Sequence, residues 1–550
     1  MTDRSTGPRR AWTVAAVVVA VLSGCSGEGS PGSAAPVARA AAQHLRVAVG
    51  EDEFMRGEPP ALDVGMLADG LNPGIFETLT MLTPSFGVRA GLAQRWEARS
   101  PTEWRFELRD GVRFHDGTPL DAAAVVESLR RITGPGAGNV DADTVALRRS
   151  PPRGLEPDSA SAVDDLVVGI TLSEPNLRLA EQLADPFTAI QAPGTQAGDG
   201  STPEATPTGT GPFRFSSYRP GVDLEVIADP AYRDGAPELD SITFRFGEAR
   251  DASLLLATGE VDAVGYVAAE LLANVSGGPE RLMRSVPARA TLVLLNRGGI
   301  GEWATLQEDA VREAVVLAVD RGAVAATAWP AHGEPSRSLI PEVVLGAAAE
   351  EVRPPPSDVA AAGEVLDEAG WTVGSDGIRE RDGRRLALDV TVRHPGEGLP
   401  AAAAAVADQL ASVGIATTVT SPSAGGPTPL QRVNAASFDL FVDLRPQVDA
   451  DPCALCRLFS IRPGGDLTVS GVVGAGEAAD TIFEQVHVAP SIDAARRGAA
   501  DLVQVVVRDE MVAVPLATLP NVWLVSSRVE AFEPAAVSGA QEWGRVFLSR

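Results

Sequence analysis

Residues 91–131 read GLAQRWEARSPTEWRFELRDGVRFHDGTPLDAAAVVESLRR, and this stretch decides the fold. Apolar and charged residues alternate over Trp104–Leu108, which is the period of a strand with one buried face. Asp110-Gly111 has the composition of a tight hairpin turn, and the alternation resumes at Val112 and Phe114. The stretch therefore predicts a β-hairpin.

A helix is predicted immediately after this hairpin. Val125, Leu129 and Ile132 are spaced i, i+4 and i+7, which places them on one helical face. Asp121 precedes them and is a residue type that caps helix N-termini. Residues 134–161 are rich in Gly, Pro, Asp and Ser, so we expect an exposed loop there.

The second half of the chain alternates strands and helices. Helices are predicted over 308–321, Ser357–Ala369 and 400–413. Asp382-Gly383 predicts a hairpin turn. Residues 386–420 read as strand, helix and strand, a βαβ unit whose two strands should run parallel.

The N-terminus has the features of an export signal. Arg4, Arg9 and Arg10 precede an apolar run over 11–22 that is shorter than the roughly 20 residues a membrane-spanning helix needs. The run ends in Leu-Ser-Gly-Cys25, which resembles the lipobox of bacterial lipoproteins. We expect residues 1–24 to be removed, by the general secretory or the twin-arginine route, and Cys25 to be lipidated.

The composition limits what the chain can do. It has 550 residues, a formal net charge of −27 and 45% hydrophobic residues. A length of this size suggests two to four domains, and the apolar share is that of a globular protein. Nucleic-acid binding is a poor match, because phosphate recognition needs a basic surface.

Besides Cys25, the sequence contains two cysteines, Cys453 and Cys456. An even pair outside the cytoplasm favours a disulfide. A redox site and half of a zinc site remain open alternatives, although no second Cys pair or His pair completes a metal site.

Catalytic motifs are absent from the sequence. None of the five His lies in H-E-x-x-H, and there is no G-x-S-x-G and no phosphate-binding G-x-x-x-x-G-K-[ST]. Asp141-x-Asp143 and Asp449-x-Asp451 lack the Gly and Glu of an EF-hand loop. We therefore predict a non-enzymatic protein with no cofactor and no metal site.

Taken together, the motifs resemble the extracellular solute-binding proteins of family 5, which serve ABC importers of peptides, nickel and related solutes. The similarity covers essentially all of residues 44–550. The residues that carry it are Phe76-Glu77-Thr78-Leu79, Trp96-Glu97, Trp104-x-Phe106-x-Leu108, Gly209-Thr210-Gly211-Pro212-Phe213, Gly259-Glu260-Val261-Asp262, Leu295-Asn296, Leu366-Asp367-x-Ala369-Gly370-Trp371, Phe438-Asp439-Leu440, Asp451-Pro452 and Val514-Pro515-Leu516.

The resemblance implies an α/β fold of the class II periplasmic-binding-protein type. Two lobes are joined by two crossing strands, expected near 285–292 and 508–516, and lobe I carries an extra β-rich subdomain. The implied divisions are a signal peptide at 1–24, a flexible tether at 25–43, lobe I at 44–75, 206–289 and 509–550, the extra subdomain at 76–205, and lobe II at 290–508.

The resemblance also suggests ligand-binding residues. In peptide-binding relatives an Asp just before Asp-Pro takes the amino group of the ligand, and Asp449 lies near that place. Arg445 offers a bidentate carboxylate clamp, and Asn296 and Gly209–Gly211 are candidate cleft-wall residues. A solvated acidic loop pinned by Cys453 and Cys456 is the alternative for this segment.

The expected function is that of a monomeric, lipid-anchored, extracytoplasmic protein that delivers a peptide or peptide-like solute to an ABC permease and ATPase. Closure of the two lobes around the solute would provide the signal. A nickel chelate or an oligosaccharide as cargo, a sensor or scaffold role, and a secreted hydrolase are the alternatives.

Overall fold

The computed structural model describes residues 39–50, 55–56, 61–62, 71–84, 86–133, 151–193, 206–247, 254–267, 272, 280–422, 426–459, 473–537 and 539–550. The predicted signal peptide, Cys25 and most of the predicted tether lie outside these ranges. The tether prediction is too long at its C-terminal end. Arg39 forms a β-bridge with Ser549, and the Ala40 amide donates to the Leu548 carbonyl at 2.9 Å.

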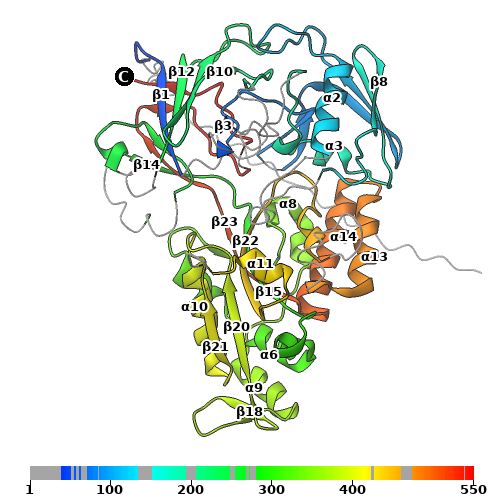
Figure 1. The fold of residues 1–550 in the computed structure, drawn as a ribbon, viewed down its shortest axis with the longest axis vertical. Coiled ribbons are helices and arrows are strands. Elements are labelled where there is room, and N and C mark those ends of the chain that lie inside the picture. Colours follow the sequence, from blue (N-terminus) through cyan, green and yellow to red (C-terminus); the bar gives the residue numbers. More distant parts are fainter. Residues whose placement is uncertain are drawn as a thin grey trace, which may run out of the picture. The chain divides into compact units, whose positions relative to one another are not determined.

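A seven-stranded sheet joins the start of the chain to its end (Figure 1). Its central strand β1 (His44–Val49) pairs in parallel with β12 and β13, and its alternating apolar side chains enter a core that includes Trp523 and Trp543. The strand order is β10 (Phe213–Arg219), β11 (Asp223–Ala228), β12 (Ser241–Phe246), β1, β13 (Ala263–Val264), β24 (Val522–Ser526) and β14 (Glu280–Arg284).

A four-stranded antiparallel sheet contains the opening stretch of the sequence. Its order is β6 (Ala93–Ser100), β7 (Glu103–Leu108), β9 (Val167–Thr171) and β8 (Ala160–Asp164). Helix α2 (Ala122–Thr133) packs its buried face, with Val125 and Leu129, into the same core as Phe106. The predicted cap is confirmed, because the Ala124 amide donates to Asp121 Oδ1 at 2.8 Å.

Two predictions for this region are wrong. Strand β7 pairs with β6 and β9, and residues 112–114 form no strand, so Asp110-Gly111 turns the chain without closing a hairpin. The segment that begins at residue 151 is not an exposed loop throughout, since Arg153 is 8% and Leu155 is 4% exposed. Both side chains find partners that are distant in the sequence, which local composition does not reveal.

A six-stranded sheet is built from the second half of the chain. Its order is β16 (Glu334–Pro335), β23 (Ala513–Leu519), β15 (Arg289–Leu295), β22 (Leu440–Pro446), β20 (Ala387–Val392) and β21 (Ala416–Thr420). The predicted parallel pairing is confirmed, because β20 runs parallel to β21. Strand β20 also runs parallel to β22.

Helices surround this sheet. The predicted helix over 308–321 is two helices, because Asp320 caps a new one by accepting the Ala323 amide at 3.0 Å. The helices are α6 (Asp309–Ala318), α7 (Arg321–Ala328), α8 (Glu342–Leu345), α9 (Val359–Glu368), α10 (Leu399–Ser412), α11 (Pro429–Asn434), α13 (Gly476–His487) and α14 (Ile492–Gln504), with a π-helical turn at Val505–Asp509.

Two passages connect the seven-stranded and six-stranded sheets. The first runs from β14 to β15 over residues 285–288, within the predicted crossing. The second lies at Pro520-Asn521, between β23 and β24, and not at 508–516, because β23 pairs with β15 along its whole length. The Asn521 amide donates to Ser285 Oγ at 2.9 Å, so the two passages are tied together.

Strands β18 and β19 confirm the turn predicted at Asp382-Gly383. Both strands belong to a set of short elements that complete the described chain. These elements are β2 (Met55–Arg56), β3 (Ala61–Leu62), β4 (Thr80–Leu82), β5 (Val88–Ala90), α3 (Leu179–Gln182), β17 (Thr372–Val373), β18 (Arg379–Arg381), β19 (Arg384–Arg385), β25 (Val529–Glu530) and β26 (Phe547–Leu548), with 3-10 turns at Pro186–Thr188, Gly301–Gln307, Gly346–Glu351 and Leu455–Leu458.

Candidate functional site

The carboxyl ends of β20 and β22 meet at one edge of the six-stranded sheet, and charged residues gather there. Asp443 on β22 is fully buried, and it accepts Arg393 Nη1 at 3.0 Å and Arg445 Nε on its two carboxylate oxygens. Burial alone would raise the pKa of Asp443, but the charges of Arg393 and Arg445 outweigh it and lower that pKa. We call Arg393, Asp443 and Arg445 the arginine cluster.

A second ion pair lies at the same edge. Arg289, at the start of β15, pairs with Glu397 in the turn that follows β20, and Trp329 Nε1 donates to the Glu397 carbonyl at 2.7 Å. Burial lowers the pKa of the neighbouring His394. Arg289, Arg393 and Arg445 thus lie at one edge of the sheet together with the carboxylates of Asp443 and Glu397. In α/β sheets, ligands bind outside the carboxyl ends of parallel strands.

Sequence reasoning found only Arg445 of this group. Arg393 and His394 were missed, although they follow directly after a strand of the predicted βαβ unit, and that position is a usable signal. The structure shows Arg445 bound to Asp443 on its own strand. Its predicted role as a clamp for an external carboxylate stays a prediction.

The loop after β22 is tightly hydrogen-bonded. Gln447 Nε2 donates to the carbonyls of Asp449 and Asp451 at 3.0 and 2.9 Å, and the Asp451 amide donates to Asp449 Oδ1 at 2.9 Å. Asp449 is 3% exposed, and burial, Asp451 and Asp185 raise its pKa well above the ordinary value. In this conformation Asp449 presents no exposed carboxylate to a ligand amino group, so that prediction needs the loop to move.

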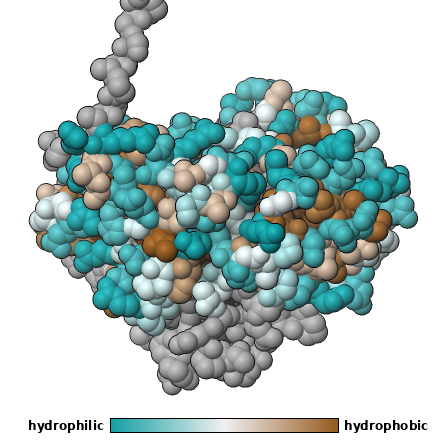
Figure 2. All heavy atoms as spheres, turned by 90° about the horizontal axis from the view of Figure 1, so that it is seen from above, coloured by the Kyte–Doolittle hydropathy of each residue, from teal (hydrophilic) through white to brown (hydrophobic). Residues whose placement is uncertain are grey.

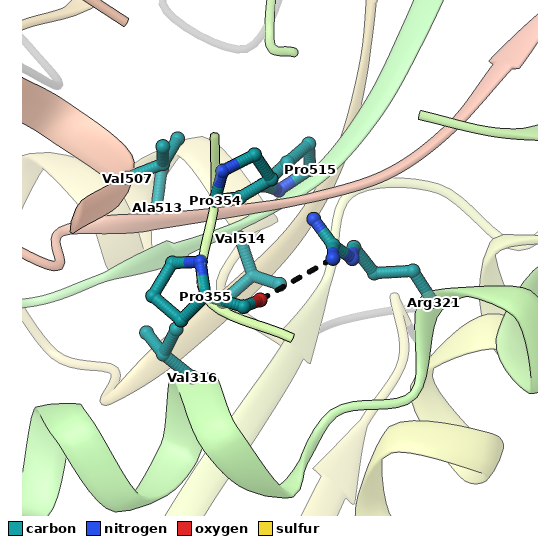
Figure 3. Close-up of a pocket in the computed structure, with 8 residues that line it drawn as sticks. All are labelled: Val316, Arg321, Pro354, Pro355, Val507, Ala513, Val514 and Pro515. Atoms are coloured by element: carbon teal, nitrogen blue, oxygen red, sulfur yellow. Dashed lines mark hydrogen bonds between the residues drawn. The ribbon is translucent and has the colours of Figure 1, made fainter. Parts of the chain in front are cut away.

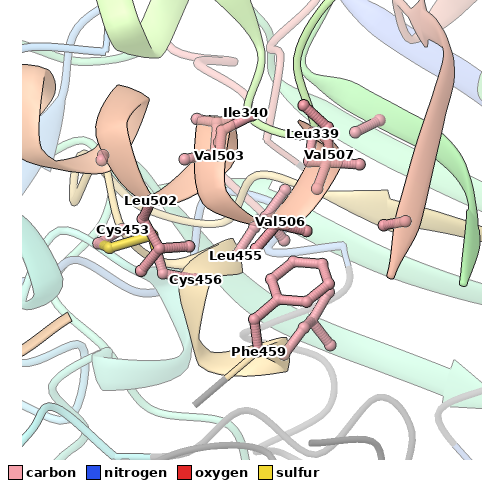
Figure 4. Packing of buried hydrophobic residues seen from close by; sticks show 14 of the residues in the cluster. Leu339, Ile340, Cys453, Leu455, Cys456, Phe459, Leu502, Val503, Val506 and Val507 are labelled. Atoms are coloured by element: carbon pink, nitrogen blue, oxygen red, sulfur yellow. A yellow bond between two sulfur atoms is a disulfide. The ribbon is translucent and has the colours of Figure 1, made fainter. Parts of the chain in front are cut away.

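The loop is also fixed by the cysteines. Cys453 and Cys456 are joined by a disulfide and are at most 1% exposed, and Figure 4 shows their sulfur atoms beside Leu455 and Leu502 in the hydrophobic core. The Cys453 amide donates to Asp451 Oδ1 at 2.9 Å. The alternative of a solvated acidic loop is wrong, because the carboxylates of Asp449 and Asp451 are buried.

Asn296 does not belong to this edge. Strand β15 is antiparallel to β22, so its carboxyl end pairs with the beginning of β22, opposite the arginine cluster. Asn296 is fully buried, and its Nδ2 donates to the carbonyls of Ala436 and Phe438 at 3.1 and 2.6 Å. It connects two segments of the fold, and its predicted place in the cleft wall stays a prediction.

Gly209–Gly211 also has a local structural role. A Cβ atom on Gly209 would lie 2.0 Å from the Ile75 carbonyl oxygen, and one on Gly211 would lie 2.2 Å from that of Gly74. Thr210 Oγ1 donates to Glu77 Oε2 at 2.9 Å. The two glycines therefore permit close backbone contact beside the seven-stranded sheet, and Thr210 contributes to a buried ion-pair network.

One shallow pocket elsewhere on the six-stranded sheet is too small to be the ligand site. It encloses about 10 Å³, whereas sites for small molecules span roughly 300–1,000 Å³. Figure 3 shows Arg321 at its rim with Nη2 donating to the Pro355 carbonyl, 3.3 Å away. Among the described residues, no three His, Cys, Asp or Glu are grouped to hold a metal ion.

Comparison with known proteins now decides the family. The family model for bacterial extracellular solute-binding proteins, family 5 Middle, matches residues 87–462, more than half of the chain. The chain belongs to this family. It is therefore a binding protein and not an enzyme, and like other members it is extracytoplasmic.

Curated relatives include glutathione-binding proteins named GsiB. The protein from Salmonella paratyphi A is 28% identical over 345 residues, which cover 61% of this chain and 63% of the relative. The protein from Escherichia coli K12 is 28% identical over 278 residues, which cover 49% and 50%. These alignments span less than two thirds of the relatives.

Solved structures share the fold of this family 5 protein. NikA from Brucella suis in complex with Fe(III)-EDTA aligns with a TM-score of 0.74 and 22% identity over 91% of this chain and all of that one. DppA from Helicobacter pylori in complex with the peptide STSA aligns with 0.71 and 19% over 92% and 98%. AgaA in complex with agropinic acid gives 0.72 and 21% over 92% and 99%. The two-lobe α/β fold predicted from the sequence is confirmed.

Proposed function

We propose that this family 5 protein captures a peptide or peptide-like solute at the arginine cluster and delivers it to an ABC permease and ATPase. The observation that carries the proposal is the arginine cluster itself, where Arg393 and Arg445 bracket one carboxylate at the carboxyl edge of two parallel strands. An arginine fork fits the carboxylate of a peptide. The glutathione-binding relatives and the peptide complex of DppA support this class of solute.

Closure around the solute is the proposed mechanism. The two passages at residues 285–288 and Pro520-Asn521 are the covalent links between the two large sheets in the described chain. A solute that contacts both sides only when they approach shifts the population toward the closed state. No bond is made or broken.

The cargo is tested by calorimetry with glutathione and with defined tripeptides, preceded by native mass spectrometry of the co-purified solute. Arg393→Gln should weaken binding at least tenfold. Arg432→Gln is the matched control. Arg432 forms a comparable ion pair with Asp389, with 2.9 Å between Nη1 and Oδ1, and this pair lies away from the arginine cluster. Affinity that Arg393→Gln leaves unchanged would exclude the arginine cluster as the site.

A nickel chelate is the second candidate cargo. NikA structures from Staphylococcus aureus in complex with Ni(L-His)2 share this fold, with a TM-score of 0.70 and 15% identity. His394, which follows Arg393 of the arginine cluster, would supply an imidazole nitrogen to the nickel ion of such a chelate. Titration with nickel and histidine in place of peptides distinguishes the two classes of cargo.

Membrane anchoring through Cys25 is the remaining part of the proposal. None of the helices in the described ranges is long and apolar enough to cross a membrane. The face of the protein in Figure 2 is mostly hydrophilic, with apolar residues in separate groups. The lipobox-like sequence Leu-Ser-Gly-Cys25 supports attachment through a lipid on Cys25, and Cys25→Ala should move the protein from the membrane fraction to the soluble fraction of cells.

A further inference from the structure

A buried polar contact joins two parts of the chain that are distant in the sequence. The segment around α3 contacts the C-terminal end of α13 and the loop after β22. The Leu177 amide donates to the His487 carbonyl at 2.6 Å, and Arg178 Nη2 donates to the Ala489 carbonyl at 3.0 Å. Gln182 Nε2 donates to Asp451 Oδ2 at 2.6 Å.

The centre of this contact is fully buried. Gln182 is 1% exposed, and Asp451 and His487 are not exposed at all. His487 Nδ1 lies 2.8 Å from the Phe483 carbonyl and 3.5 Å from Arg153 Nη1. The other ring nitrogen faces Asp451 Oδ2 at 3.6 Å. We call Gln182, Asp451 and His487 the latch.

A second ion pair lies beside the latch. Arg153 is 8% exposed and pairs with Glu484 on α13 and, at 2.9 Å, with Glu174 on its own side. Arg153 and Gln182 belong to one segment, because the Arg153 amide donates to Gln182 Oε1 at 3.1 Å. The contact therefore consists of hydrogen bonds and ion pairs between the segment around α3 and the segments formed by α13 and the loop after β22.

The position of the latch in the chain links it to the relative movement of the two large sheets. Residues 71–193 are inserted between β1 and β10, which both belong to the seven-stranded sheet. The loop after β22 and α13 are inserted between strands of the six-stranded sheet. A rotation about the passages at 285–288 and Pro520-Asn521 would separate the two surfaces and break the contact.

We propose that the latch holds the closed state of this protein without touching the solute. It rests on the proposed capture of solute by closure, but it acts in the absence of solute. Each hydrogen bond that forms only in the closed state raises the closed population, and the apparent affinity for the solute rises with that population. The latch thus sets how often the empty protein is closed.

Gln182→Glu tests this proposal with an almost isosteric change. The Oε1 atom that accepts the Arg153 amide and, at 2.8 Å, Asn176 Nδ2 is kept, while the donor to Asp451 becomes a second carboxylate oxygen. Repulsion between two buried carboxylates should open the latch. The solute-free full chain is studied by hydrogen exchange and small-angle scattering. We expect at least tenfold faster exchange of the Leu177 amide and a larger radius of gyration.

Two further variants make the test specific. Gln191→Glu introduces the same charge at a glutamine of the same segment that is 4% exposed and whose main-chain amide donates to Ser128 Oγ, so it controls for lost stability. Gln182→Glu combined with Asp451→Asn exchanges donor and acceptor across the contact and should restore slow exchange and the compact form.

The outcomes separate the latch from the cargo. Local opening in Gln182→Glu, absent from Gln191→Glu and reversed in the double variant, supports the latch. Unchanged exchange at Leu177, or equal acceleration in both single variants, overturns it. Neither result depends on peptide binding. The calorimetry can therefore contradict the proposed cargo while the exchange experiment supports the latch, and the exchange experiment can contradict the latch while calorimetry supports the cargo.

Discussion

Two ionic groups in this protein differ in how many guanidinium groups share one buried carboxylate. Glu77, beside the seven-stranded sheet, accepts both terminal nitrogens of Arg233 together with Tyr232 OH and Thr210 Oγ1, and Arg233 also pairs with Asp234 at 3.6 Å. At the arginine cluster, Asp443 accepts from both Arg393 and Arg445. The Glu77 group ties segments of the fold together, whereas the arginine cluster lies at the carboxyl edge of parallel strands, where ligands of α/β proteins bind.

The first prediction breaks the Glu77 group. Glu77→Ala should lower the free energy of unfolding by roughly 3–5 kcal/mol, because it removes the buried acceptor of Arg233, Tyr232 and Thr210 and leaves Arg233 with the exposed carboxylate of Asp234 at 3.6 Å. Urea denaturation measures the change. Arg219→Ala is the control, since Arg219 pairs with Asp223 in the same sheet but its side chain is 67% exposed, and water screens such a pair, so the free energy of unfolding should change little.

Solute binding by the folded fraction of Glu77→Ala should equal that of the unchanged protein. A lost affinity in this fraction would show that the Glu77 group takes part in binding and would remove the distinction between the two groups.

The second prediction concerns the other end of β22. Asp439 is 4% exposed and accepts the Asp389 amide at 2.8 Å, and burial raises its pKa to about 6. In contrast to Asp443, it has no arginine bound to it among the described hydrogen bonds. A raised carboxyl pKa stabilises the fold below the unfolded value near 4, and this contribution is lost as the pH rises through 6.

Asp439→Asn removes this titration. The variant should match the unchanged protein at pH 4 and should unfold with a free energy up to about 3 kcal/mol higher at pH 8, from roughly two pKa units at 1.36 kcal/mol each. Urea denaturation at both pH values is the measurement. An equal difference at the two pH values would mean that the Asp439 charge is compensated after all.

These differences mark the limit of what the sequence reveals. Alternation along β7, the βαβ unit and the Asp121 cap follow from neighbours within a few residues, and they were predictable. The burial of Asp449 and Arg153 was not. Arg153 meets Glu484 at a separation of 331 residues, and Gln182 meets Asp451 at 269.

The candidate site shows the same limit. Arg445 was predicted as a carboxylate clamp, but the convergence of Arg393 on Asp443 depends on which strands are neighbours in the sheet. The position of Asn296 at the opposite edge depends on strand direction, because the sequence does not show that β15 runs antiparallel to β22. Strand order and direction decide which edge a residue occupies.

The smallest predicted effect concerns Gly209, whose motif was read as a cleft wall. Gly209→Ala should lower the free energy of unfolding by roughly 1–3 kcal/mol, because its Cβ would press on the Ile75 carbonyl and force the backbone apart. Gly247→Ala is the matched control, since a Cβ there has no neighbour within 4 Å and should change stability by less than about 0.5 kcal/mol. Thermal and urea denaturation give both values.

Solute affinity separates the two possible roles of Gly209. If the glycine only permits close packing beside Glu77, then Gly209→Ala loses stability and keeps its affinity for solute below the unfolding transition. If affinity falls while stability is kept, the segment over residues 209–211 contacts the solute. The Glu77 group would then belong to the binding site together with the arginine cluster, because Thr210 connects this segment directly to Glu77.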